Sequence, residues 1–201
     1  MTTVDRDLHA HHDQRVFLHG ATWADYERLL AVRGESAVPR ITYLEGEIEL
    51  MSPSTNHEWI KTILARLLEA WSEEMDVDLN GYGSWTVKRT DRERGLEPDE
   101  CYILGTDEKP RPDLAIEVVI TSGGLSKLEV YRGLGVPEVW FWRRDRLEVH
   151  VLRGDSYVAA PASELLPSLD LTLLARFVDT RNQPQAVRAF RAALRARTGD
   201  A

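Results

Sequence analysis

The stretch RPDLAIEVVITSGGLSKLEVYRGLGVPEVWFWRR, residues 111–144, decides the fold. Its apolar run over 114–120 is rich in β-branched residues and is broken once, by Glu117, so it predicts a strand buried on both faces. Apolar residues at helical spacing follow over 125–134, and strand character returns over 136–142. A strand, a helix and a second strand in this order are typical of a parallel crossover unit.

Glu117 is the first candidate for a functional residue. An acid in the middle of a core strand is costly unless it is paired or binds a metal. The sequence therefore predicts that its carboxylate lies in a cleft.

The remaining elements follow from periodicity and turn signals. A helix is expected over 23–33 after the N-cap Thr22, a hairpin over 40–51, and a long amphipathic helix from Thr55 to about Met75 that opens with a capping box. The pattern also predicts strands at 77–89 and 99–104, a charged loop at 90–97, a hairpin of 147–152 with 157–160, a short helix within 164–179, and a last helix over 185–197. We expect an α/β fold in which a mixed β-sheet, with 114–120 at its centre, is flanked by helices 55–75 and 125–134.

Composition sets the class of protein. With 201 residues, 43% hydrophobic and 29% charged, the chain is an ordinary soluble protein. Residues 1–16 are polar and are expected to be a disordered tail, and 17–201 a single domain with a C-terminal helix. No run approaches the roughly 20 apolar residues that span a membrane, and no secretory signal is visible.

The cysteine count and the net charge restrict the class of protein further. A single cysteine, Cys101, fits the cytoplasm, and its apolar surroundings favour core packing over a nucleophilic role. The formal charge of −8 argues against a non-specific nucleic-acid coat protein. It leaves a nuclease possible, because an acidic metal site and basic flanks can share one surface.

Two Pro-Asp pairs precede strands and supply further carboxylates, at Asp99 and Asp113. Adjacent strands could bring Asp99 close to Glu117. Paired carboxylates suit a hard divalent cation, Mg²⁺ or Mn²⁺, which would polarise a phosphoryl group and activate water.

At this point four motifs in order resemble a known family. They are Tyr43-Leu44-Glu45-Gly46-Glu47-Ile48 with Met51-Ser52-Pro53 and His57, then Pro98-Asp99, then Asp113-Leu-Ala-Ile-Glu117-Val118 followed by Lys127 and Tyr131, and last Gly135-Val-Pro-Glu-Val-Trp140. Over roughly residues 21–174 the chain is similar to the Uma family of "putative restriction endonucleases", a branch of the PD-(D/E)XK nuclease superfamily.

The resemblance implies a set of site residues. Asp99 and Glu117 would hold the metal with the backbone carbonyl of Val118, and Glu47, or else Glu45, would add an acid. Asp113 is the weaker metal candidate, because a Pro-Asp pair at a strand start is more often a turn or cap.

The chain departs from the superfamily pattern at the lysine. Position 119, two residues after the acid, is Val. Lys127 on the following helix is the replacement we expect, with Tyr131 one turn further on and on the same face. Lys88 is the other candidate. His57, at the start of a helix, serves either as a cap or as a site residue.

The resemblance implies a Mg²⁺- or Mn²⁺-dependent endonuclease that cuts DNA. Basic side chains beside the expected strand ends would grip the phosphate backbone, namely Arg89, Arg92, Arg94, Arg143 and Arg144. The alternative is a nuclease fold that has lost activity and acts as a nucleic-acid-binding or dimeric module. The aromatic excess around 139–142 and the last helix predict a homodimer contact.

Overall fold

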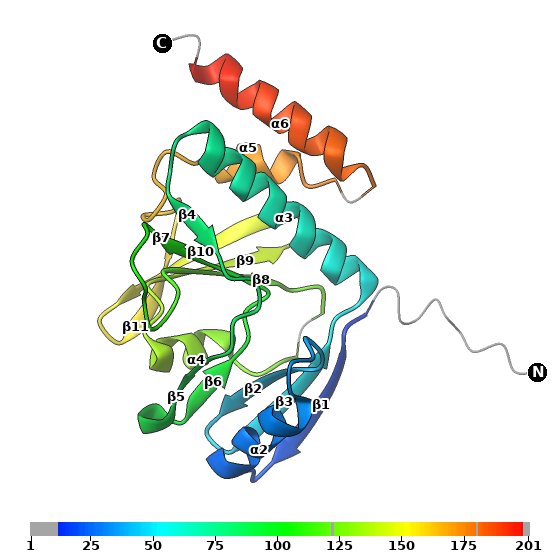
Figure 1. Cartoon of the computed structure of the whole chain (residues 1–201), viewed down its shortest axis with the longest axis vertical. Helices are drawn as coiled ribbons and strands as arrows, with labels where there is room; N and C mark the ends of the chain where they lie inside the picture. The colour runs from blue at the N-terminus through cyan, green and yellow to red at the C-terminus, as the bar shows by residue number, and fades with distance from the viewer. Residues whose placement is uncertain (1–11, 122, 180, 199–201) are drawn as a thin grey trace, which may run out of the picture.

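The structure, a computed structural model, describes residues 12–121, 123–179 and 181–198, which form two β-sheets with helices packed on them (Figure 1). The five-stranded sheet has the order β1 (Gln14–His19), β3 (Glu47–Ser52), β2 (Arg40–Leu44), β6 (Arg94–Leu96) and β5 (Val87–Arg89). The six-stranded sheet has the order β11 (Ser156–Ala160), β10 (Arg146–Arg153), β9 (Glu138–Arg143), β8 (Leu114–Val118), β7 (Glu100–Leu104) and β4 (Leu79–Gly81). The helices are α2 (Trp23–Arg33), α3 (Thr55–Glu74), the 3₁₀ turn η1 (Thr90–Arg92), α4 (Lys127–Leu134), α5 (Leu171–Arg176) and α6 (Gln183–Thr198).

Strand β8 is the centre of the fold, as its sequence predicts. All five of its residues are buried, and it pairs antiparallel with β7 and parallel with β9. Alternate residues of this strand pack into two different hydrophobic cores. Ile116 and Val118 pack in the cluster that includes α3, whereas Ala115 packs with Val130 and Tyr131 of α4. The expected α/β fold, with a mixed sheet and a crossover helix between parallel strands, is confirmed.

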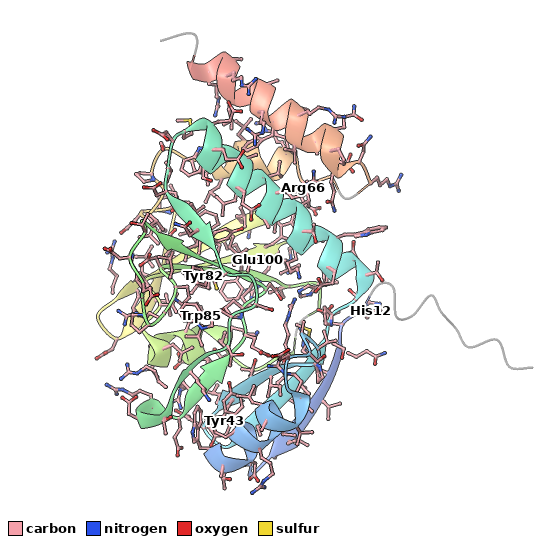
Figure 2. The ribbon with its side chains drawn as sticks, viewed as in Figure 1. His12, Tyr43, Arg66, Tyr82, Trp85 and Glu100 are labelled. Atoms are coloured by element: carbon pink, nitrogen blue, oxygen red, sulfur yellow. The ribbon has the colours of Figure 1, made fainter. Side chains whose placement is uncertain are left out.

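The long helix α3 covers one face of the six-stranded sheet and lies between that sheet and α6 (Figure 1). Its N-cap is Ser54, whose hydroxyl accepts the His57 N–H at 3.2 Å, so the expected cap at Thr55 is one residue too late. Phe190 of α6 is fully buried in the same core. Arg66, labelled in Figure 2, donates to Gln183 at 3.1 Å and joins the two helices.

The smaller sheet carries α2 on one face. Thr22 and Asp25 form a complete capping box, which confirms the predicted start of this helix. Tyr26 packs against Tyr43 of β2, which is labelled in Figure 2. The hairpin of β2 and β3 turns at Glu45 and Gly46, both at positive φ, as expected.

Three expectations about the chain between these elements are corrected. The disordered tail predicted over 1–16 is wrong at its C-terminal end, because residues 14–16 belong to β1. Residues 1–11 lie outside the described residues. The strand predicted over 77–89 is two strands, β4 and β5, in different sheets, and the predicted loop 90–97 contains η1 and β6. Short alternating segments do not specify which sheet edge they join, since every edge offers the same backbone groups.

The prediction that residues 139–142 and the last helix form a homodimer contact is also wrong in part. Residues 139–142 of β9 are at most 3% exposed, because the two faces of this strand pack into the two cores of the same chain. Cys101 is fully buried, as predicted, and burial raises the pKa of its thiol to about 12. Within the described ranges, no helix has the length and apolar character needed to cross a membrane.

Candidate active site

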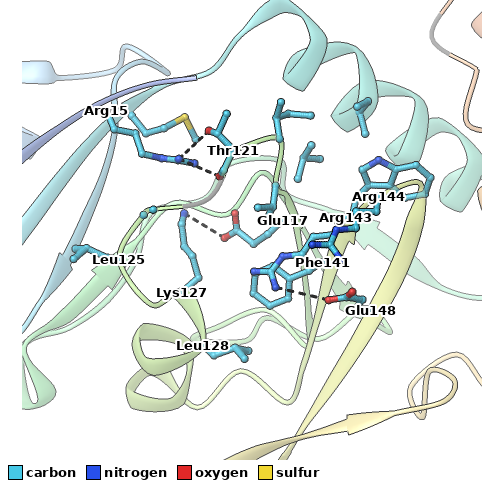
Figure 3. A pocket seen from close by; sticks show the side chains of 18 of the residues that line it. Arg15, Glu117, Thr121, Leu125, Lys127, Leu128, Phe141, Arg143, Arg144 and Glu148 are labelled. Atoms are coloured by element: carbon cyan, nitrogen blue, oxygen red, sulfur yellow. Dashed lines mark hydrogen bonds and ion pairs between the residues drawn. The ribbon is translucent and has the colours of Figure 1, made fainter. Parts of the chain in front are cut away.

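A cleft of about 820 Å³ opens where the two sheets face each other, at the C-terminal end of β8 (Figure 3). One wall comes from β1 and β3, and the other from β8, residues 119–121 and 123–126, and the start of α4. The tip of the β9–β10 hairpin forms its rim. The cleft therefore lies beside the acid that interrupts the central strand.

Glu117 is 3% exposed and points towards α4. Its Oε1 accepts a hydrogen bond of 2.5 Å from the Tyr131 hydroxyl. The same oxygen lies 3.4 Å from Lys127 Nζ (Figure 3). Burial raises the pKa of Tyr131 well above its usual value, and the Glu117 charge raises it further, so this hydroxyl keeps its proton. The structure thus brings together the predicted acid, lysine and tyrosine at one end of β8.

A second acid, Glu49, enters the cleft from β3 and is 2% exposed. Its carboxylate accepts from Arg15 Nε at 3.1 Å and from the Leu125 N–H at 2.6 Å. The Arg15 guanidinium also donates to the carbonyl and hydroxyl oxygens of Thr121, at 3.2 and 3.0 Å (Figure 3). These contacts fasten the segment between β8 and α4 to the opposite wall.

Asp99 does not line the cleft, although it touches the strand that does. Its Oδ2 accepts the Val118 N–H at 2.6 Å, one residue beyond Glu117. Its Oδ1 meets His57 Nε2 at 2.9 Å and the Arg40 guanidinium. With 1% of its surface exposed, Asp99 is enclosed behind the cleft wall.

His57 extends this buried cluster towards β1. It is fully buried, and its Nδ1 lies 3.0 Å from Asp13 Oδ2, while Asp13 Oδ1 accepts the Ser54 N–H at 2.9 Å. Burial alone would raise the pKa of Asp13, but the hydrogen bonds to His57 and Ser54 and the His57 charge lower it from 3.8 to about 2. His57 is therefore an internal link and does not line the cleft.

Two of the five predicted DNA-binding arginines reach the cleft. Arg143 and Arg144 line its rim, and Arg143 lies over the Phe141 ring at 4.7 Å (Figure 3). The other three lie elsewhere: Arg89 and Arg92 contact Asp91, and Arg94 contacts Glu45.

Three further candidates have partners outside the cleft. Glu47 accepts from His19 at 3.0 Å on the half-exposed start of β3. Asp113 caps the end of β7, accepting the Leu104 N–H at 2.8 Å and Lys109 at 2.6 Å. Lys88 pairs with Glu27 at 2.8 Å on the exposed side of β5. The structure does not bring these three together with Glu117.

The oxygen donors of the cleft fit Mg²⁺ or Mn²⁺ only in part. Across residues 12–121, 123–179 and 181–198, no group of three or more His, Cys, Asp or Glu side chains could hold a metal ion. Mg²⁺, however, is commonly held by one or two carboxylates together with water and substrate phosphate. Glu117 and Glu49 both line the cleft with Val118 beside them, and their oxygens already accept from Tyr131, Arg15 and the Leu125 N–H.

Sequence reasoning missed Glu49, Arg15, Arg40 and Asp13. A signal for Glu49 was present, because period-two alternation along β3 places it between Ile48 and Leu50 of the α2 core. Asp13 and Arg15 carried no such signal, since they lie at the start of a short edge strand next to a polar segment.

The two sheets and the crossover helix make this a mixed α/β protein, with Glu117, Lys127 and Tyr131 clustered beside the cleft. The Uma2 family, described as "Putative restriction endonuclease", matches residues 23–180. The chain belongs to this family, as the motifs around Glu117 indicated.

Among solved structures, the chain is similar to the crystal structure of "a putative nuclease belonging to DUF820" from Anabaena variabilis ATCC 29413. The two are 14% identical with a TM-score of 0.47, over 79% of this chain and 99% of the other. No curated protein matches the chain.

Proposed function

We propose that the chain is a metal-dependent endonuclease that hydrolyses DNA phosphodiester bonds in this cleft. The observation that carries the proposal is the Glu117 carboxylate, buried on an apolar strand yet lining the cleft beside Lys127. A buried acid is retained at a cost unless it has a role there. Membership of the Uma2 family supports the same conclusion.

Glu117 and Glu49, with the Val118 carbonyl, would hold Mg²⁺ or Mn²⁺. When bound, the cation would polarise a phosphoryl oxygen and lower the pKa of water. Lys127 Nζ, fixed near Glu117, would stabilise negative charge on the non-bridging phosphate oxygens and orient the attacking water. Tyr131 keeps the Glu117 carboxylate in place through its hydroxyl.

The rim supplies the contacts for the DNA backbone. Arg143 and Arg144 lie on a hairpin tip where Arg144 and Asp145 both have positive φ. Two consecutive residues with positive φ form a tight hairpin turn, and this turn places the two arginines at the mouth of the cleft. Basic side chains at this place would bind the phosphate oxygens of DNA, and such contacts do not depend on the base sequence.

Cleavage of supercoiled plasmid tests the proposal. In Mg²⁺ or Mn²⁺ the wild type should nick or linearise the plasmid, Glu117→Gln should be inactive, and Lys127→Met should be slower by roughly 100-fold, as for the loss of one electrostatic stabiliser. Glu164→Gln and Lys88→Met are matched controls, since both residues lie in ion pairs away from the cleft, and both should cleave like wild type.

A second candidate is a nucleic-acid-binding module without nuclease activity. Asp99 favours it, because Arg40 and His57 enclose the aspartate that the family pattern implies as a metal ligand. A wild type that binds DNA but leaves the plasmid intact in both cations would establish this alternative and overturn the nuclease.

A further inference from the structure

We propose that two copies of this chain associate through β1, and that the two β1 strands pair antiparallel into one continuous sheet of ten strands, five from each copy. β1 lies at the outer margin of the five-stranded sheet (Figure 1), and among the described strands only β3 pairs with it. An edge strand presents a row of backbone N–H and C=O groups that another strand can bind. The inference does not depend on the proposed function, because it concerns this edge and not the chemistry of the cleft.

β1 carries apolar side chains that the described residues leave exposed. Val16 is 55% and Leu18 is 39% exposed, and both lie on the face of the sheet opposite to Arg15. Across the ladder they face Leu50 and Ile48, which belong to the apolar cluster formed with α2. Val16 and Leu18 therefore extend the apolar surface beneath α2 to the edge of the sheet.

The other edge strands of the two described sheets are better protected against association. β4 and β5 are three residues long, and β5 carries the charged side chains Lys88 and Arg89. β11 has one large apolar side chain that is exposed, Val158. Short edges and charged side chains are the usual protection against edge-to-edge pairing. The six residues of β1 include no proline, glycine or acid.

The sequence of β1 favours one register for the pairing. When Phe17 faces Phe17 of the second copy, Val16 faces Leu18 of the second copy, and the two-fold axis repeats this apolar pair. A register centred on Val16 would instead place Leu18 opposite Gln14, an apolar side chain against an amide. Apolar cross-strand pairs stabilise a sheet, so we expect the register centred on Phe17.

The charges of β1 do not oppose this pairing. In the register centred on Phe17, Arg15 faces His19 of the second copy. Arg15 already pairs with Glu49 of its own chain at 3.1 Å, and His19 lies 3.0 Å from Glu47 of its own chain. Each basic side chain therefore brings a carboxylate of β3 to the contact. A second copy thus fits this edge in backbone hydrogen bonding, in apolar pairing and in charge.

Cysteine cross-linking of the full chain tests the pairing and its register. Phe17→Cys should form a disulfide-linked dimer under mild oxidation, because facing Cα atoms of an antiparallel pair lie about 4.5–5.5 Å apart, within the reach of a disulfide. Val16→Cys alone should not, because its two Cα atoms would lie about 8 Å apart. An equal mixture of Val16→Cys and Leu18→Cys should cross-link. Wild type is the control, since its single cysteine, Cys101, is fully buried.

Sedimentation equilibrium over a series of concentrations tests the association itself. Wild type should approach twice the mass of one chain as the concentration rises. Val16→Lys with Leu18→Lys would place like charges opposite each other and should stay a monomer, with circular dichroism as the check on folding. Val158→Lys is the matched control, because Val158 is an exposed valine on another edge strand, and it should dimerise like wild type.

Three results would overturn the proposal. A wild type that stays a monomer at every concentration would show that no second copy binds this edge. A dimer that persists in the double lysine variant would place the contact on another surface. Cross-linking by Val16→Cys alone, with none by Phe17→Cys, would contradict the register and the apolar pairs that favour a second copy.

Discussion

At the scale of single residues, the pairing of Glu117 explains how a core strand tolerates an acid. Its carboxylate meets one cation, Lys127, and one neutral donor, Tyr131, in place of water. Val119, the position where the superfamily pattern has lysine, packs instead with the apolar cluster around α4. The positive charge beside Glu117 therefore belongs to Lys127, the first residue of α4. The connection between β8 and α4 brings this residue back to the end of the strand.

Tyr131→Phe should destabilise the fold by about 1.5–3 kcal/mol, because it removes a hydrogen bond to a buried charge. Tyr157→Phe is the matched control: its hydroxyl donates to the Val136 carbonyl, a neutral acceptor, and its loss should cost about 1 kcal/mol. Urea unfolding of both variants measures the difference. Equal losses would contradict a special contribution of the Tyr131–Glu117 hydrogen bond to stability.

At the scale of elements, the contacts of Thr121 and Leu125, between β8 and α4, help to decide where Lys127 lies. Arg15 of β1 holds the connecting segment through Thr121, and Glu49 of β3 holds it through the Leu125 amide. Two strands of the five-stranded sheet, β1 and β3, thus hold the connection between β8 of the six-stranded sheet and α4. The position of Lys127 over Glu117 depends on both.

Arg15→Gln should release this segment. Amide hydrogen exchange over 119–126 should speed up by roughly tenfold or more, since several charge-assisted bonds worth about 1.5–3 kcal/mol each are lost. Arg28→Gln, which breaks only an exposed pair with Asp25, should leave exchange there unchanged. Unchanged exchange in Arg15→Gln would show that the segment is held by packing alone.

The elements that sequence predicts well are those with strong local signals. The central β8–α4–β9 unit has an apolar run, a helical stripe and Gly135 at positive φ at the helix end. β4, β5 and β6 were harder, because three-residue strands are too short for an alternation pattern. Alternation along β3 places Glu47 and Glu49 on the same face, opposite Ile48 and Leu50, but it does not show which of the two acids meets the cleft.

At the scale of the whole molecule, charged side chains join the two sheets behind and across the cleft. The series from Glu49 through Arg15, Asp13 and His57 to Asp99 crosses between them. Sequence separation hides such a series, since its members come from β1, β3, α3 and the start of β7. The stability of the assembled cleft should therefore depend on pH.

Asp13 gives the direction of this dependence. Because its pKa falls from 3.8 to about 2 on folding, its charged form stabilises the folded state above about pH 4, and this contribution is lost as the pH falls through 2. The contribution is roughly 2 kcal/mol. Asp13→Asn should remove it, so its unfolding free energy should fall less steeply than that of wild type between pH 4 and 2. Parallel curves from urea unfolding would contradict the assignment.

The position of a bound Mn²⁺ ion tests the central claim most directly. Anomalous scattering from a crystal of the wild-type protein soaked in Mn²⁺ would locate it. We predict a peak in the cleft, about 2.2 Å from carboxylate oxygens of both Glu117 and Glu49, close to the distances of other small hard cations. A peak on Asp99 with Arg40 displaced, or the absence of any peak beside Glu117, would contradict it.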